Sequence, residues 1–295
     1  DNRFMKSEGI DDSCEKAVAY LDAVVGDHDD TPGANRERRL AYVAQAPKMI
    51  DFLVSQGIRL RRIPSWPDYH AAPGESVPGR TVVSELFDIN QLGEWKSRLR
   101  PGFLPLPANL DEAMQLPNFK RSWASKKVIA RVIGRTIVSR LAGKHLVTAG
   151  QALQGQMLHA ALKAGAEIRI NAGVRQLVVE DGRVTGVVIE KNGAEWRIGA
   201  RSGVLVNAGG FARNQRMLDR YIPGTSTEWS NTTPGDTGEM IEEAARIGSA
   251  IAQMDERIGS PVTLPPGNPP VKPPMQGDIS KPHTIVVDQT GERYM

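Results

Sequence analysis

Apolar residues recur at helical spacing in several stretches, and most of these stretches follow a residue that caps helices well. The side chains of Ser, Thr and Asn accept hydrogen bonds from the first N–H groups of a helix, and Gly commonly ends one. The apolar stripe after Ser13 and the longer one that runs from Asn35 to Gly57 both fit this scheme. The pattern predicts helices that begin after Ser13, Asn35, Asn109 and Thr148, and a further helix within residues 120–141.

Shorter apolar or alternating runs predict strands. Glu180-Asp181-Gly182-Arg183 has the turn chemistry of a hairpin between two of them. A helix that ends near Gly165 leads directly into the apolar run Ala166–Ile170, which is half of a βαβ unit and typical of an α/β fold. The expected strands are 58–63, 166–170, 176–179, 183–190, 195–200 and a short buried one at Val204–Val206.

Composition and charge narrow the class of protein. Of 295 residues, 40% are hydrophobic and 24% charged, as in a soluble globular protein, and the net charge of +3 is too balanced to favour nucleic-acid binding. Cys14 is the only cysteine, so there is neither an internal disulfide nor a cysteine metal cluster, and no metal site is predicted. No apolar run approaches the ~18 residues of a membrane span. A reducing cytoplasm is the expected location.

The stretch from Lys120 to Leu141 is both basic and amphipathic. A helix of this kind can lie on a membrane surface or meet a partner protein. More often it presents a solvated face, which is the interpretation that the sequence favours here.

The run Val204–Asn214 is the most informative stretch for chemistry. Its apolar residues end at Ala208-Gly209-Gly210, where the glycines leave the backbone bare and allow a flat cofactor to touch it. An ordinary turn between a strand and a helix would explain the run alone equally well.

Two further sequence motifs favour the cofactor interpretation of this run over an ordinary turn. A hairpin pattern over Ala172–Ile189 precedes the run, and Pro234-Gly235-Asp236-Thr237-Gly238-Glu239-Met240-Ile241 follows it. In this order the three blocks resemble the flavoproteins of the fumarate reductase and succinate dehydrogenase type, the FAD-binding family two group. Within that group the chain is most similar to the 3-ketosteroid dehydrogenases, through Pro67-Asp68-Tyr69 and the glycines that follow it.

The resemblance implies a Rossmann-like FAD-binding domain interleaved with an α+β catalytic domain. The expected cofactor-domain parts are 1–57 and 148–258, the catalytic part is 58–147, and 259–295 is a linker that returns to the catalytic domain. No Gly-x-Gly-x-x-Gly fingerprint is present, so we expect that segment before Asp1 and a further one after Met295. The chain is then an interior fragment that binds FAD weakly or not at all by itself.

The resemblance also assigns roles to individual residues. Tyr69 corresponds to an active-site tyrosine, and a phenol can act as a base if its neighbours lower its pKa from ~10. The alternative is that Tyr69 merely packs against Trp66. The implied cofactor-binding residues are Asn2 beside the flavin, Val174 at the adenine through its backbone, Ala208, Gly209 and Gly210 at the glycine turn, and Thr237, Gly238 and Glu239 at a helix start.

The helix-start block departs from the pattern of its relatives. Glu239 stands where an Asp is usual, and Met240 replaces a Gly, which puts the close approach of the backbone to the cofactor in doubt. A purely structural alternative is that Asp236 or Thr237 only caps the helix.

The implied function is an FAD-dependent oxidoreductase that dehydrogenates a bulky, steroid-like enone and passes the electrons to an acceptor. One alternative is a fumarate or other enoate reductase that uses the same flavin in the opposite direction. Another is a binding protein that keeps the fold without the flavin.

Overall fold

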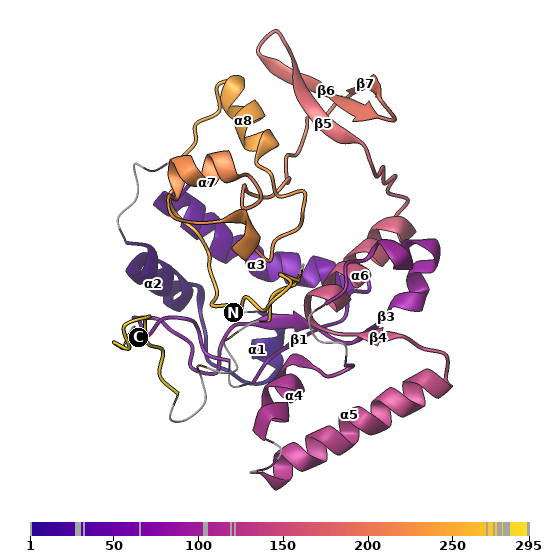
Figure 1. Cartoon of the computed structure of the whole chain (residues 1–295), viewed down its shortest axis with the longest axis vertical. Coiled ribbons are helices and arrows are strands. Elements are labelled where there is room, and N and C mark those ends of the chain that lie inside the picture. The colour runs from indigo at the N-terminus through magenta and orange to yellow at the C-terminus, as the bar shows by residue number, and fades with distance from the viewer. Residues whose placement is uncertain are drawn as a thin grey trace. The chain divides into compact units, whose positions relative to one another are not determined.

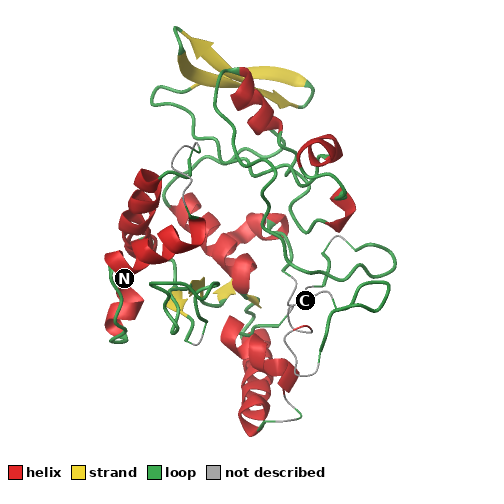
Figure 2. Ribbon diagram, turned by 90° about the vertical axis from the view of Figure 1, so that its left-hand side faces the viewer, coloured by secondary structure: helices red, strands yellow, loops and turns green. Residues whose placement is uncertain are grey.

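The computed structural model divides into two compact units, residues 1–167 and 168–295. Figures 1 and 2 show that helices dominate the first unit, whereas long loops connect the few elements of the second. The structure describes residues 2–26, 31, 33–64, 66–102, 106–118, 120, 122–269, 271–273, 275, 279 and 284–293.

The helices of unit 1 begin largely where the capping residues predict. The Ser13 hydroxyl accepts a hydrogen bond from the N–H of Lys16 at 3.2 Å, and the Asn35 carbonyl oxygen accepts one from Arg38 at 3.0 Å. The helices are α1 (Arg3–Ser7), α2 (Cys14–Val25), α3 (Arg36–Ser55), α4 (Leu110–Gln115), α5 (Trp123–Leu141) and α6 (Ala149–Lys163), with 3-10 segments η1 (Ile89–Arg98) and η2 (Leu116–Asn118).

The strands of unit 1 form two small antiparallel pairs. β1 (Leu60–Arg62) pairs with β2 (Val82–Ser84), and β3 (Phe87–Asp88) pairs with β4 (Leu146–Val147). The side chain of Gln156 on α6 is buried and joins the helix to the first pair. It accepts from the N–H of Arg59 at 2.8 Å and donates to the Ser84 hydroxyl at 2.7 Å.

Two apolar clusters hold unit 1 together. The first joins β3, η1, β4 and α6, and Gly155 lets α6 approach closely, since a Cβ there would lie 2.8 Å from the Phe87 ring. The second joins α5 to the segment before α4. The buried members are Phe87, Ile89, Leu92, Val147 and Ala152 in the first cluster, and Ala108, Val128 and Val132 in the second.

Unit 2 begins with the three-stranded antiparallel sheet that the hairpin pattern predicts. Its strands are β5 (Gly173–Glu180), β6 (Arg183–Lys191) and β7 (Ala194–Gly199), in that order. Both connections are two-residue turns with positive φ, at Asp181-Gly182 and Asn192-Gly193. Such turns match the twist of the strands they connect.

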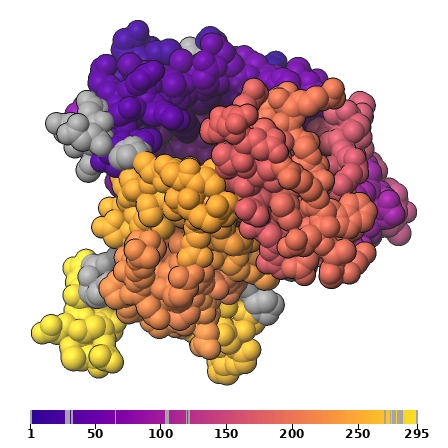
Figure 3. Space-filling view, turned by 90° about the horizontal axis from the view of Figure 1, so that it is seen from above, coloured from indigo at the N-terminus to yellow at the C-terminus, as the bar shows by residue number. Residues whose placement is uncertain are grey.

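The remainder of unit 2, orange to yellow in Figure 3, is rich in loops. It contains α7 (Gln215–Tyr221), the 3-10 segment η3 (Thr227–Trp229) and α8 (Glu239–Arg246). Near its end, Val287 and Arg293 form one isolated antiparallel bridge around a turn. Of the predicted linker 259–295, residues 270, 274, 276–278, 280–283, 294 and 295 lie outside the described residues. In the parts of the chain that the structure describes, no helix is both long enough and apolar enough to cross a bilayer.

Two predicted strands are wrong for this structure. Ala166–Ile170 and Val204–Val206 have extended or irregular backbones without ladder partners, and Leu205 is 92% exposed rather than buried. A strand requires a neighbour that satisfies its N–H and C=O groups, and in a parallel sheet that neighbour is distant in sequence. Every ladder among the described residues is antiparallel, and none includes either run.

Candidate functional site

The segment that carries Tyr69 is anchored on the half-buried Arg80. Arg80 donates through Nη2 to Asp12 at 2.7 Å, and through Nη1 to Asp68, the residue before Tyr69. Nη2 also reaches the carbonyl of Gly74 at 2.9 Å. One guanidinium therefore ties both ends of the 68–80 segment to the start of α2.

Charge and burial explain why this network is stable. Burial by itself would raise the pKa of Asp12, but the hydrogen bond and the positive charge of Arg80 hold that pKa below its usual range. Burial would also lower the pKa of Arg80, and its two carboxylate partners raise it instead. The charged forms of Asp12 and Arg80 are thus both favoured in the folded protein.

Two glycines allow the segment to lie close to its surroundings. A Cβ on Gly74 would lie 2.2 Å from the carbonyl oxygen of Lys16, and one on Gly79 would lie 1.5 Å from that of Trp66; both have positive φ. The N–H of His70 donates to the Tyr20 hydroxyl at 3.0 Å. With its two neighbours held in this way, Tyr69 itself is 82% exposed and is presented to solvent rather than packed.

Asn2 lies on the same network. Its side-chain oxygen caps α1 by accepting from Phe4 at 3.0 Å and Met5 at 3.1 Å, and its amide donates to the carbonyl of Arg80 at 3.4 Å. This buried side chain is therefore committed within unit 1, and its place beside a flavin stays a prediction. The structure does link Asn2 to the Tyr69 segment through Arg80.

In unit 2, the glycine turn and the start of α8 come together at Asp236. The carboxylate of Asp236 accepts from the N–H of Gly210 at 2.5 Å, and its backbone carbonyl accepts from Arg213 at 2.9 Å. Gly209 has φ of 80°, and a Cβ there would lie 2.4 Å from the same carboxylate. The predicted residues Ala208 and Gly209 are exposed, so their backbone is open to a ligand.

The start of α8 differs from the capping alternative. Gly238, in a left-handed conformation, is the N-cap, and neither Asp236 nor Thr237 caps the helix. The Thr237 hydroxyl donates to the Glu239 carboxylate, which is exposed at the helix start. Met240 is 8% exposed and turned into the unit, so its side chain does not obstruct this end of α8.

Val174 belongs to the same neighbourhood through β5. The carboxylate of Glu243 on α8 accepts from the backbone N–H of Leu177 at 2.6 Å, which fastens the sheet to the helix. A hydrogen bond from Arg246 outweighs burial and lowers the pKa of Glu243, so this link is anionic. The structure therefore assembles the three predicted cofactor segments of unit 2 around α8.

These residues fit a flavin nucleotide. The open backbone at Ala208 and Gly209 can receive a planar group. The exposed acid at Glu239, at the start of α8, can accept hydrogen bonds from hydroxyl groups. These two features suit a molecule that combines a flat ring with a hydroxylated chain.

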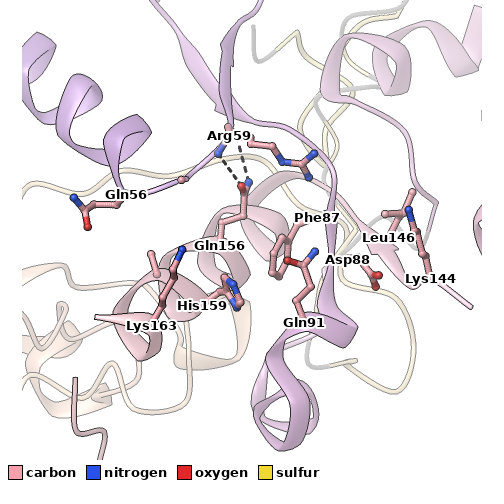
Figure 4. Close-up of a pocket in the computed structure, with 12 residues that line it drawn as sticks. Gln56, Arg59, Phe87, Asp88, Gln91, Lys144, Leu146, Gln156, His159 and Lys163 are labelled. Carbon is pink, nitrogen blue, oxygen red and sulfur yellow. Dashed lines mark hydrogen bonds between the residues drawn. The ribbon is translucent and has the colours of Figure 1, made fainter. Parts of the chain in front are cut away.

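A separate hollow in unit 1 was not predicted. It encloses about 440 Å³, and Figure 4 shows Arg59, Lys144, His159 and Lys163 around it, with Gln156 bonded to Arg59 at one wall. None of the predicted site residues lines it.

Sequence reasoning missed the residues that hold the site together. Arg80 and Asp12 are 68 positions apart, and Glu243 lies 66 positions from the N–H that it accepts from. Charged side chains are common, and a pairing over such distances leaves no local pattern. The sequence analysis suggests Asp236 only as a possible helix cap. Its position within the run Gly-Asp-Thr-Gly is the local pattern that could have indicated a larger role.

Comparison with known proteins identifies the family of the chain. The FAD binding domain family matches residues 2–295. The 3-oxosteroid 1-dehydrogenase of Mycolicibacterium smegmatis is 29% identical over 100% of this chain and 52% of its own length. The 3-ketosteroid delta1-dehydrogenase of Sterolibacterium denitrificans, solved with 1,4-androstadiene-3,17-dione, superposes with a TM-score of 0.79 at 30% identity, covering 92% of this chain and 50% of that one.

A more distant structure shares the fold alone. The open conformation of a flavocytochrome c3 fumarate reductase has a TM-score of 0.50 at 19% identity, over 85% of this chain and 32% of its own. The chain spans about half the length of the curated relatives it matches. Because the family model matches nearly all residues, the chain belongs to the FAD binding domain family, with FAD as its cofactor.

Proposed function

We propose that the protein dehydrogenates a 3-ketosteroid, or a similar bulky cyclic enone, by forming a carbon–carbon double bond next to the carbonyl. The observation that carries the proposal is the Tyr69 segment, which the Arg80 network holds in place while the phenol stays exposed. The similarity to 3-ketosteroid dehydrogenases over nearly the whole chain supports the substrate class.

In this reaction the substrate loses one proton and one hydride from adjacent carbons. Tyr69, as the phenolate, takes the proton from one of these carbons, and the electron pair of that C–H bond becomes the new double bond. When bound, FAD would supply the acceptor for the hydride. Hydrogen bonds to the ketone oxygen stabilise the enolate-like charge that builds up as the proton leaves.

The residues of unit 2 hold the cofactor in this proposal. Its parts are bound by the backbone of Ala208–Gly210, by Thr237, Gly238 and Glu239 at the α8 start, and by the backbone of Val174. Asn2 is proposed as a neighbour of the flavin. The sequence-derived division into cofactor parts 1–57 and 148–258 and a catalytic part 58–147 is proposed with them. The reduced flavin then requires an electron acceptor.

The single, exposed Cys14 is consistent with a cytoplasmic location.

The test uses the full-length protein and its visible spectrum. Anaerobic addition of a 3-ketosteroid should bleach the flavin bands in the wild type. Tyr69→Phe should bind the steroid and lower kcat by at least about 100-fold, the usual contribution of a general base. Tyr42→Phe, a change at another exposed tyrosine, should leave kcat unchanged.

Other outcomes would overturn the proposal. A flavin that steroid leaves oxidised, but that transfers electrons from a reduced dye to fumarate, would favour the reductase alternative. A soluble full-length protein without flavin would favour a binding protein. Full activity of Tyr69→Phe would reject Tyr69 as the base and leave the substrate class standing.

A further inference from the structure

Helix α5 has an unusual distribution of apolar side chains. One face packs into unit 1 through Val128 and Val132, with the small polar residues Ser125 and Ser139 on the same side. Figure 1 shows α5 extending along the edge of the unit, with α4 near its start. The helix is therefore held by one side only.

The opposite face is apolar and exposed. Trp123, Ile137 and Leu141 are 78%, 55% and 84% exposed. At about 100° per residue these three lie within roughly 40° of one another and about 140–180° from Val132. Ile133 and Val138 extend the same surface on either side, at 53% and 66% exposure. Exposed apolar residues scattered singly are normal, whereas a contiguous apolar face marks an interaction site.

Cationic side chains border this face. Residues 123–141 contain five Lys or Arg residues and no carboxylate. Arg135 is already paired with a buried carboxylate, because it donates to Glu112 at 2.6 Å. Lys126 lies over the Trp123 ring at 4.3 Å from its centre, and Lys127 and Arg140 are exposed on the two flanks.

A groove beside the face adds apolar depth. It encloses about 460 Å³ between α5 and the segments before and after α4, and its walls are almost entirely hydrocarbon. The residues that line it are Leu106, Leu116, Ile129, Val132, Ile133, Thr136 and Ile137. A groove of this kind is suited to an acyl chain and offers little to a polar ligand.

We propose that α5 is a docking helix that lies flat on an anionic phospholipid bilayer. An apolar face between rows of Lys and Arg is the pattern of helices that lie in the membrane interface. Trp at the edge of that face suits the boundary between headgroups and acyl chains. The cations provide charge complementarity to anionic headgroups, and five charges within 19 residues exclude a spanning orientation.

Docking does not require substrate, so it is tested without any. Full-length wild-type protein is sedimented with phosphatidylcholine vesicles that contain phosphatidylglycerol, and with phosphatidylcholine vesicles alone. We expect binding to the anionic vesicles only, weakened by salt because screening shortens the reach of surface charges.

Matched double variants separate the apolar from the charged contribution. Ile137→Ser/Leu141→Ser should weaken vesicle binding at least about 10-fold, while Ile258→Ser/Leu264→Ser, at exposed apolar positions of unit 2, should not. Lys127→Gln/Arg140→Gln should weaken it on the order of 30-fold, while Arg183→Gln/Arg201→Gln should have no effect.

Three results would overturn the proposal. The first is absence of wild-type binding to anionic vesicles, and the second is α5 variants that bind as well as the wild type. The third is a face already covered without lipid. A dimer that Ile137→Ser/Leu141→Ser dissociates would show that a second copy covers it.

Discussion

Arg80 is the residue on which the proposed catalytic segment depends most. Its side chain is 20% exposed, and those of its partners Asp12 and Asp68 are 1% and 10% exposed. Charges removed from water to this extent are tolerated only when they are paired. The same contacts fix the backbone around Tyr69, so this network of three charged side chains positions a proposed reactive group.

Replacing Arg80 with Ala should destabilise the protein by about 3–5 kcal/mol, because two buried carboxylates lose their partner. Arg197→Ala removes an ion pair with Glu180 in which both side chains are more than half exposed, and should cost less than about 1 kcal/mol. Urea unfolding of the two variants and the wild type measures both values. Equal losses for the two variants would contradict the role given to burial.

The contact between α4 and α5 shows how a single acid organises two helices. Glu112 accepts a backbone hydrogen bond from Asn109 at 2.9 Å, which closes the start of α4. It also receives Arg135 of α5 through both oxygens, at 2.6 and 2.9 Å. The hydrogen bond from Arg135 outweighs burial and lowers the pKa of Glu112 below its usual 4.5.

Because the pKa of Glu112 is lowered, we expect the contribution of the α4–α5 contact to stability to depend on pH. The carboxylate is favoured in the folded state, so its stabilisation is complete above pH 4.5 and is lost as pH falls through the folded pKa. Glu112→Gln should therefore cost about 1–3 kcal/mol near pH 6 and progressively less below pH 4.5. Urea unfolding across this range measures the difference, and Glu180→Gln at an exposed pair is the control. A cost that stays constant down to about pH 3 would rule this explanation out.

For the whole molecule, FAD binding and stability should be coupled. A ligand that binds only the folded state stabilises it by about 2.7 kcal/mol at 100 times its Kd. Deflavinated full-length protein should therefore unfold at lower urea concentration than protein in excess FAD.

A substitution at Gly238 tests whether the start of α8 contributes to FAD binding. A Cβ there would lie 2.6 Å from the Met217 sulfur and 2.7 Å from Phe211 Cβ, so Gly238→Ala must displace the helix start. We expect its FAD affinity to fall at least about 10-fold, on the order of 1.4 kcal/mol. Gly248→Ala also has positive φ but meets open space among the described residues, and should keep its affinity. FAD titration of the apoproteins measures both, and equal affinities would exclude α8 from the cofactor site.

Short sequence patterns correctly predicted the elements that depend on residues close to one another in the chain. The caps at Ser13 and Asn35 and the hairpin at Asp181-Gly182 depend on residues within a few positions of one another, and all three are confirmed. The strands predicted at 166–170 and 204–206 depend on partners distant in the chain, and the same reasoning failed there. The family and its cofactor were recognisable because three ordered motifs carry them.

The sequence by itself determined the helix starts, the three-stranded sheet, the family and the FAD cofactor. Each of these depends on residues that are close in the chain or on motifs that follow one another in a fixed order. Only the tertiary structure decided which side chains became buried partners. Arg80 with Asp12 and Asp68, and Glu243 with the N–H of Leu177, are pairs whose energies come from exclusion of water after folding. The exposed face of α5 is of the same kind, because packing alone decided that Val128 and Val132 are buried while Ile137 and Leu141 lie in solvent.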